Sequence, residues 1–90
     1  MIVVMDFMMV EQGKFALNMP KGADILSVGF TQDGRPCIWA RCDSDAELEK
    51  RTLYVARTRV RADEIKDAKF IGSVSGIGYG IHVFELGGAE

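Results

Sequence analysis

The stretch DILSVGFTQDGRPCIWARC, residues 24–42, carries two apolar runs rich in β-forming residues, ILSVGFT (25–31) and PCIWARC (36–42). Between them stand four residues, QDGR (32–35), which contain the pair Asp33-Gly34. Asp-Gly between two such runs is a strong hairpin signal, because glycine adopts the positive φ of a tight turn at little cost. The stretch therefore predicts an antiparallel hairpin and a β-rich fold.

The rest of the chain repeats this pattern of short runs roughly every ten residues, with turn signals between them. Such spacing is typical of antiparallel sandwiches and small barrels. We expect an all-β chain, or a β-rich one with one short helix at 61–68, in which an antiparallel meander of six or seven strands forms a small sandwich or barrel. The polar segment 43–50 is expected to be a loop or one helical turn. The predicted strands are residues 2–10, 14–19, 25–31, 36–42, 52–59, 69–75 and 79–86.

Length and composition exclude several classes of protein. Ninety residues, of which 48% are hydrophobic and 27% charged, predict a single soluble globular domain over residues 1–90. A formal net charge of −2 argues against bulk binding to nucleic acid. No apolar run reaches the ~20 residues that a membrane helix needs. The apolar start MIVVMDFMMV (1–10) contains Asp6 and lacks a preceding basic region, so we interpret it as a strand rather than a signal peptide and expect a cytoplasmic protein.

The segment MPKGADILSVGFTQDGRPCIWARCD (19–43) resembles the core M-P-x-G-A-x-I-L-x-V…G-x-P-C-I-W-A of small hypothetical proteins that bacteriophages and prophages encode. Phe70-Ile71-Gly72 and the closing His82-Val83-Phe84-Glu85 match the same pattern in order. The resemblance extends over about residues 14–86. It implies a small β-rich phage protein in the cytoplasm of a host cell, and it implies no general activity, because none is established for the family.

The chain departs from that pattern after its fifth predicted strand. Family members usually have a Gly-Thr-Gly-His-Pro-type loop there, whereas this chain has Arg57-Thr58-Arg59-Val60-Arg61. Any role that the family's loop histidine plays therefore does not transfer to this chain.

Residue types that perform catalysis are scarce. His82 is the single histidine, and it shares a strand face with Phe84 and Leu86, so we expect a packed, hydrogen-bonded residue rather than a general base. Cys37 and Cys42 are five residues apart on one predicted strand and would point to opposite faces, which predicts buried or half-buried thiols and no disulfide. We expect no enzyme, no cofactor and no metal site.

Arginine alternation is the clearest functional signal. Arg57, Arg59 and Arg61 would share one face of an extended backbone, where guanidinium groups can bind phosphate in bidentate fashion. Acidic residues of the chain itself at 63, 64 and 67 could instead neutralise them. The predicted ligand-binding set consists of Trp39, Arg41, Arg57, Arg59, Arg61, Gly76 and Gly78.

Each of the other members of this set has both a functional and a structural interpretation. Trp39 and Arg41 share a face of the fourth predicted strand and could stack a base and clamp a phosphate, although Trp39 is also a candidate core residue. Gly76 and Gly78 could let backbone N–H groups approach an anion, or could simply form a hairpin connection.

Two functions are consistent with these residues. The first is a phage counter-defence protein that sequesters a small anionic, nucleotide-derived signal of the host without turning it over. The second is an interaction module that inhibits or adapts a host or virion protein through an exposed strand. The first predicted strand is apolar on both faces, so we also expect a homo-oligomer, most simply a dimer.

Overall fold

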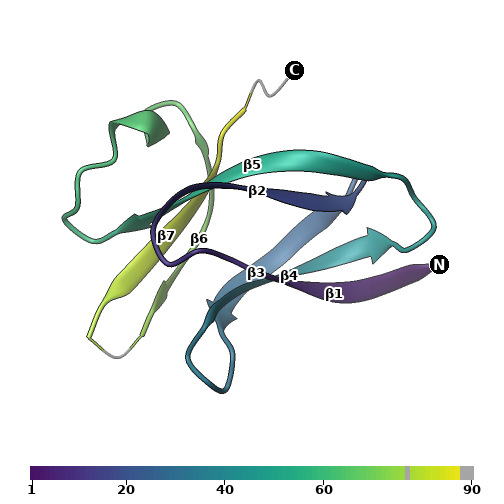
Figure 1. The fold of residues 1–90 in the computed structure, drawn as a ribbon, viewed down its shortest axis with the longest axis horizontal. Coiled ribbons are helices and arrows are strands. Elements are labelled where there is room, and N and C mark those ends of the chain that lie inside the picture. Colours follow the sequence, from purple (N-terminus) through teal and green to yellow (C-terminus); the bar gives the residue numbers. More distant parts are fainter. Residues whose placement is uncertain (77, 88–90) are drawn as a thin grey trace.

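The computed structural model describes residues 1–76 and 78–87 and consists almost entirely of strands (Figure 1). A single turn of 3-10 helix, η1 (Asp63–Ile65), falls within the segment where a short helix was predicted. The strands are β1 (Ile2–Met8), β2 (Gly13–Pro20), β3 (Asp24–Phe30), β4 (Pro36–Asp43), β5 (Leu48–Arg57), β6 (Lys69–Ser75) and β7 (Gly80–Glu85).

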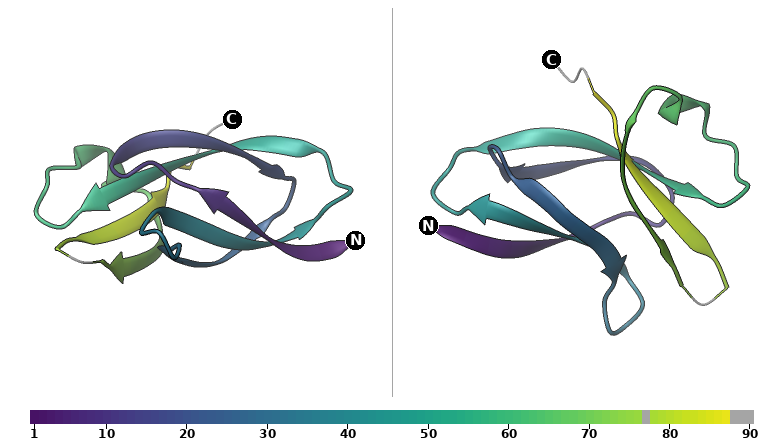
Figure 2. Two further views of the ribbon diagram at one scale, coloured as in Figure 1. Left: turned by 60° about the horizontal axis from the view of Figure 1, so that its bottom comes forward. Right: turned by 180° about the vertical axis from the view of Figure 1, so that it is seen from behind.

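The seven strands form two antiparallel sheets that pack face to face, as Figures 1 and 2 show. The three-stranded sheet has the order β1-β4-β3, and the four-stranded sheet has the order β2-β5-β7-β6. The prediction of an antiparallel β fold with six or seven strands is confirmed. Of the two predicted architectures, sandwich and barrel, the structure has the sandwich, because the sheets do not close into a barrel. The predicted meander is wrong, because only β3–β4 and β6–β7 pair as consecutive strands and the chain changes sheet after β1, β2 and β4.

The core lies between the two sheets, and β4 is the central strand of the three-stranded sheet. Ile38 of β4 packs against Leu53 and Val55 of β5 and against Ile81 and Val83 of β7, and all five side chains are fully buried. A central strand must satisfy its backbone N–H and C=O groups along both edges. β4 does so by pairing with β1 on one side and β3 on the other.

The predicted hairpin between β3 and β4 is present. Gly34 has φ 83°, its N–H donates to the Thr31 carbonyl at 2.9 Å, and the Thr31 N–H donates to the Arg35 carbonyl at 2.8 Å. The Thr31 hydroxyl also donates to the Asp33 carboxylate, and this hydrogen bond lowers the pKa of Asp33. The Asp-Gly turn therefore acts as the sequence indicated.

β5 differs from its predicted bounds at both ends. It begins at Leu48, inside the predicted polar loop, because Leu48 and Lys50 pair with Pro20 and Asn18 of β2. It ends at Arg57, two residues early, because the chain turns at once: the Val60 N–H donates to the Arg57 carbonyl at 3.1 Å.

The ion pair between Arg51 and Glu85 lies at the edge of the core, next to the β2–β3 turn. Arg51 donates two hydrogen bonds to the Glu85 carboxylate, at 2.7 and 2.8 Å, and a third to the Ala23 carbonyl at 2.6 Å. Both side chains are less than a fifth exposed. The Arg51 guanidinium holds the pKa of Glu85 below its ordinary value, so the pair stays charged at neutral pH.

Cys37 and Cys42 are both buried and free. Burial raises the pKa of the Cys37 thiol, which makes it a poor nucleophile. Within residues 1–76 and 78–87, no helix has the length and apolar character that crossing a membrane requires.

Candidate functional site

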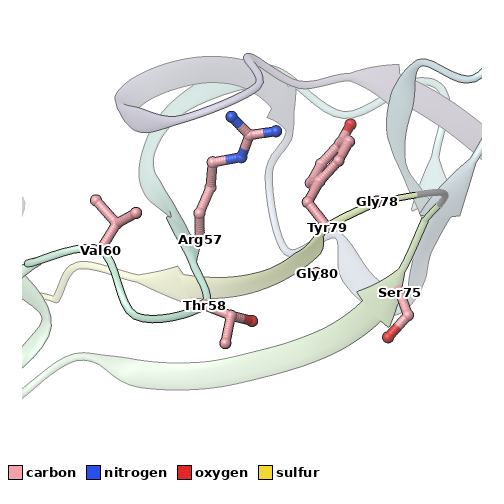
Figure 3. Close-up of a pocket in the computed structure, with 7 residues that line it drawn as sticks. All are labelled: Arg57, Thr58, Val60, Ser75, Gly78, Tyr79 and Gly80. Carbon is pink, nitrogen blue, oxygen red and sulfur yellow. The ribbon is translucent and has the colours of Figure 1, made fainter.

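Arg57 and Tyr79 stand side by side where the four-stranded sheet runs past the core (Figure 3). Along β5, Leu53, Val55 and Arg57 alternate with residues of the other face, so Arg57 projects from the same face of the sheet as the two core residues. Tyr79 shares that face for the same reason, because it precedes Ile81 and Val83 at every second residue. The guanidinium carbon of Arg57 lies 4.0 Å from the centroid of the Tyr79 ring. This geometry is a cation–π stack, which holds the guanidinium in place while leaving its N–H groups available.

The Arg57–Tyr79 pair lines an open hollow of about 630 Å³. Thr58 and Ser75 project from the opposite side of the sheet, so the hollow straddles the end of the strands (Figure 3). The complete lining is Arg57, Thr58, Val60, Ser75, Gly78, Tyr79 and Gly80. It therefore offers a fixed cation, an aromatic face, two hydroxyl groups and exposed glycine backbone.

Tyr79 also borders a second hollow, of about 320 Å³, on the side of the β3–β4 hairpin. The rings of Phe30 and Tyr79 meet edge to face, with centroids 5.8 Å apart. Gly76 is required at this contact, because a Cβ there would lie 2.8 Å from the Phe30 ring. Gly78 has φ 90° in the connection between β6 and β7, whose middle residue, Ile77, lies outside the described residues.

The predicted row of three arginines on one face does not exist. The strand ends at Arg57, and Arg59 follows with φ 69°, so the backbone is not extended through this segment. Arg59 lines a third hollow, of about 320 Å³, together with His82 and Phe84. This hollow shares Arg57, Thr58 and Val60 with the large one, but Arg59 does not line the large one. Arg61 pairs with Asp63 at 2.8 Å, which is the neutralisation by a neighbouring acidic residue that the sequence left open.

Trp39 and Arg41 lie elsewhere. Their neighbours Ile38 and Ala40 face the core, so the side chains of Trp39 and Arg41 project from the outward face of the three-stranded sheet. Trp39 is half-buried there, with its ring over Gly29, and is not a core residue. Arg41 pairs with Asp24 at 2.6 Å.

The residues of the predicted ligand-binding set therefore do not form one site. Arg57 and Gly78 line the large hollow, and Gly76 lines its neighbour. Trp39, Arg41, Arg59 and Arg61 lie outside both.

The ring nitrogens of His82 contact two hydroxyl groups. Nδ1 lies 2.7 Å from the Ser73 hydroxyl, and Nε2 lies 2.8 Å from the Thr58 hydroxyl. Among the residues that the structure describes, no carboxylate orients this imidazole, as the third member of a catalytic triad would. In the part of the chain that the structure describes, no three histidine, cysteine or acidic side chains gather to hold a metal ion.

Sequence reasoning missed Tyr79, the residue that gives Arg57 its environment. An aromatic residue inside a glycine-rich connection could have indicated a contact with another part of the chain, because the turn itself does not need a large apolar side chain. The partner of Tyr79 could not be inferred from the sequence, since Arg57 reaches it only through the long-range pairing of β5 with β7.

A family model described as a domain of unknown function, DUF7352, matches residues 6–90. The chain belongs to this family. The match begins within β1 and covers every later element, so the Arg57–Tyr79 pair and the hollow belong to the family's domain. Neither the curated proteins nor the solved structures contain a significant match to the chain.

Proposed function

We propose that the protein is a small binding protein that sequesters an anionic, nucleotide-like ligand at Arg57 and does not turn it over. One observation carries the proposal: Arg57 is half-buried and stacked on Tyr79 at a hollow, and it forms no ion pair with any of the described residues. Arg41, Arg51 and Arg61 pair with Asp24, Glu85 and Asp63. Arg35 and Arg59 also form no ion pair with a described residue, but both are exposed and neither stacks on an aromatic ring there.

A guanidinium in this position suits a phosphate group. Its planar N–H groups match two phosphate oxygens, and such charge-assisted hydrogen bonds are among the stronger ones in proteins. The Tyr79 ring orients the guanidinium before the ligand arrives, which reduces the entropy lost on binding. The backbone at Gly78 supplies further polar contacts at the same hollow, whereas the Ser75 hydroxyl lies on the other side of the sheet.

The dimensions support a ligand of nucleotide size. A volume of about 630 Å³ lies within the range of small-molecule sites. The adjoining hollow at Phe30 shares Tyr79 with it. A ligand with its phosphate at Arg57 could therefore place an aromatic base against Tyr79 and Phe30.

Sequestration rather than catalysis follows from the surrounding groups. Hydrolysis of a nucleotide usually needs a metal site or a positioned base. Both His82 nitrogens are engaged by hydroxyl groups, and the imidazole lies on the face of the sheet opposite Arg57. In line with the resemblance to phage proteins, the proposed biological role is counter-defence: removal of a nucleotide-derived immune signal of the host.

The test is a titration of the purified protein with cyclic dinucleotides and cyclic ADP-ribose variants by calorimetry. Arg57→Ala should weaken the binding of a recognised ligand by at least about tenfold, because each charge-assisted contact contributes about 1.5–3 kcal/mol. Arg61→Ala is the matched control, since it removes an arginine that is paired with Asp63, and it should bind like the wild type. Equal weakening by both variants, or no binding of any probe, contradicts the proposal.

A second candidate is an interaction module that acts on a host or virion protein through an exposed strand. One observation favours it: β1 is an edge strand whose Ile2 and Val4 side chains are 67% and 61% exposed. This candidate predicts a stoichiometric protein partner and no effect of Arg57→Ala on its binding.

A further inference from the structure

The free edge of β1 is the least protected strand edge of the fold. β1 pairs with β4 on one side and, among the described residues, with no strand on the other. It lies along the border of the molecule in both views from the front and from behind (Figures 1 and 2). Its seven residues include a single charge, Asp6, and neither lysine nor proline. A long apolar edge of this kind readily pairs with another strand.

The other three edges carry features that discourage pairing. β3 and β6 each have a bulge, between Ile25 and Ser27 and between Phe70 and Gly72, and the two strands contact each other. β2 carries Lys14 on its exposed side and ends in Pro20. Lysine, proline and bulges are the means by which sheet proteins protect their edges.

The backbone of β1 shows which groups are available. The Ser44 N–H donates to the Met1 carbonyl at 2.8 Å, and the Met9 N–H donates to the Pro36 carbonyl at 3.1 Å. Because hydrogen-bonding direction alternates along an antiparallel strand, the odd-numbered residues of β1 point their N–H and C=O groups at β4. The even-numbered residues 2, 4, 6 and 8 therefore direct theirs away from the sheet.

We propose that β1 is the interface of a symmetric dimer, in which it pairs antiparallel with β1 of a second copy and Met5 lies opposite the partner's Met5. The two three-stranded sheets then form one continuous six-stranded sheet. Met5 is the centre of the strand Ile2–Met8, so this register overlaps all seven residues. Every outward-directed N–H and C=O group of residues 2, 4, 6 and 8 finds a partner, since even residues face even residues.

The side chains favour the same register. The half-buried Val3 and Phe7 come opposite the partner's Phe7 and Val3, and exposed Ile2 comes opposite the partner's Met8, so apolar groups meet on both faces. Each Asp6 lies opposite the partner's Val4. A register centred on residue 6 would instead place two carboxylates opposite each other, which is unfavourable, and would shorten the overlap. A second copy thus matches this edge along its whole length.

The first measurement is the mass of the unmodified protein by sedimentation equilibrium at micromolar concentration. The proposal requires twice the monomer mass of 9.9 kDa. Val4→Pro removes one outward N–H that the monomer does not use, so it should give a folded monomer. Val4→Thr, which keeps the N–H and the side-chain shape, should remain a dimer. A monomeric wild type, or a dimeric Val4→Pro variant, overturns the proposal.

Cysteine crosslinking tests the register independently of stability. Odd residues would form the closely spaced pairs, with Cα atoms about 4.5 Å apart, within the range of a disulfide. Met5→Cys should therefore crosslink to itself under mild oxidation. Val3→Cys alone should not crosslink, whereas an equimolar mixture of Val3→Cys and Phe7→Cys should. Self-crosslinking of Val3→Cys, or a dimer in which Met5→Cys stays reduced while circular dichroism shows the folded state, contradicts the register. Stoichiometric pairing of β1 with a different protein in place of a second copy also contradicts it.

Discussion

Arg57 and Arg59 are two residues apart and yet have different surroundings. Arg57 ends a strand and stacks on Tyr79, whereas Arg59 occupies a turn in the left-handed region, at φ 69°. Alternation in the sequence placed both arginines on one face only because it assumed an extended backbone. The turn that separates them contains no glycine or proline, so the sequence offered no signal for it.

The strain at Arg59 leads to a stability prediction. A side chain in the left-handed region costs about 1 kcal/mol, a cost that glycine avoids. Arg59→Gly should therefore raise the melting temperature by about 5 °C in thermal unfolding followed by circular dichroism. Arg59→Ala keeps the Cβ and is the control, which should melt close to the wild type. Equal stabilisation by alanine and glycine would show that charge, not backbone strain, is relieved.

The Arg51–Glu85 ion pair predicts a pH dependence of stability. The folded-state pKa of Glu85 lies below its ordinary value of 4.5, so the pair stabilises the fold above about that pH and loses its contribution as the pH falls through the folded-state value. Glu85→Gln should lower the free energy of unfolding by about 2 kcal/mol at pH 7, because Arg51 loses charge-assisted hydrogen bonds. Urea denaturation should show this difference shrinking below about pH 4.5. A difference that is constant between pH 7 and pH 3 would exclude the ion pair as its cause.

At the scale of elements, alternation in the sequence located all seven strands because each has one face on the core. Leu53 and Val55 show this for β5, and the Asp33-Gly34 pair correctly indicated the β3–β4 hairpin. The start of β5 was missed, since residues 48–50 are polar enough to resemble a loop and become a strand only by pairing with β2. Such strand ends depend on long-range contacts, which local sequence patterns do not encode.

The contact between two hairpins gives a prediction at this scale. Gly76 lets the β6–β7 connection approach Phe30, and an alanine Cβ there would come within 2.8 Å of the ring. Gly76→Ala should lower the free energy of unfolding by about 1–3 kcal/mol, as overpacking usually does. Gly87→Ala is the control, because a Cβ at Gly87 meets no atom within 4 Å. Thermal melts in which both variants match the wild type would exclude a close contact between the hairpins.

At the scale of the whole molecule, strand spacing was sufficient to predict an antiparallel β fold, but it decided neither between sandwich and barrel nor the order of the strands. That order positions the candidate site, because pairing β5 with β7 brings Arg57 beside Tyr79. Placing β4 at the centre of its sheet leaves Trp39 and Arg41 facing outward. The proposed dimer edge at β1 lies in the three-stranded sheet, whereas the proposed ligand site lies at the end of the four-stranded sheet. Ligand binding and pairing of β1 can therefore be tested separately.

The proposed function requires that the protein holds an anionic ligand unchanged. Its most direct test is to incubate the protein with cyclic dinucleotides and cyclic ADP-ribose variants, remove unbound ligand, denature the protein and identify by mass spectrometry what it releases. We predict intact ligand in stoichiometric amount from the wild type and a strongly reduced amount from Arg57→Ala. Cleaved product in excess of protein, or equal recovery from both proteins, would contradict the account.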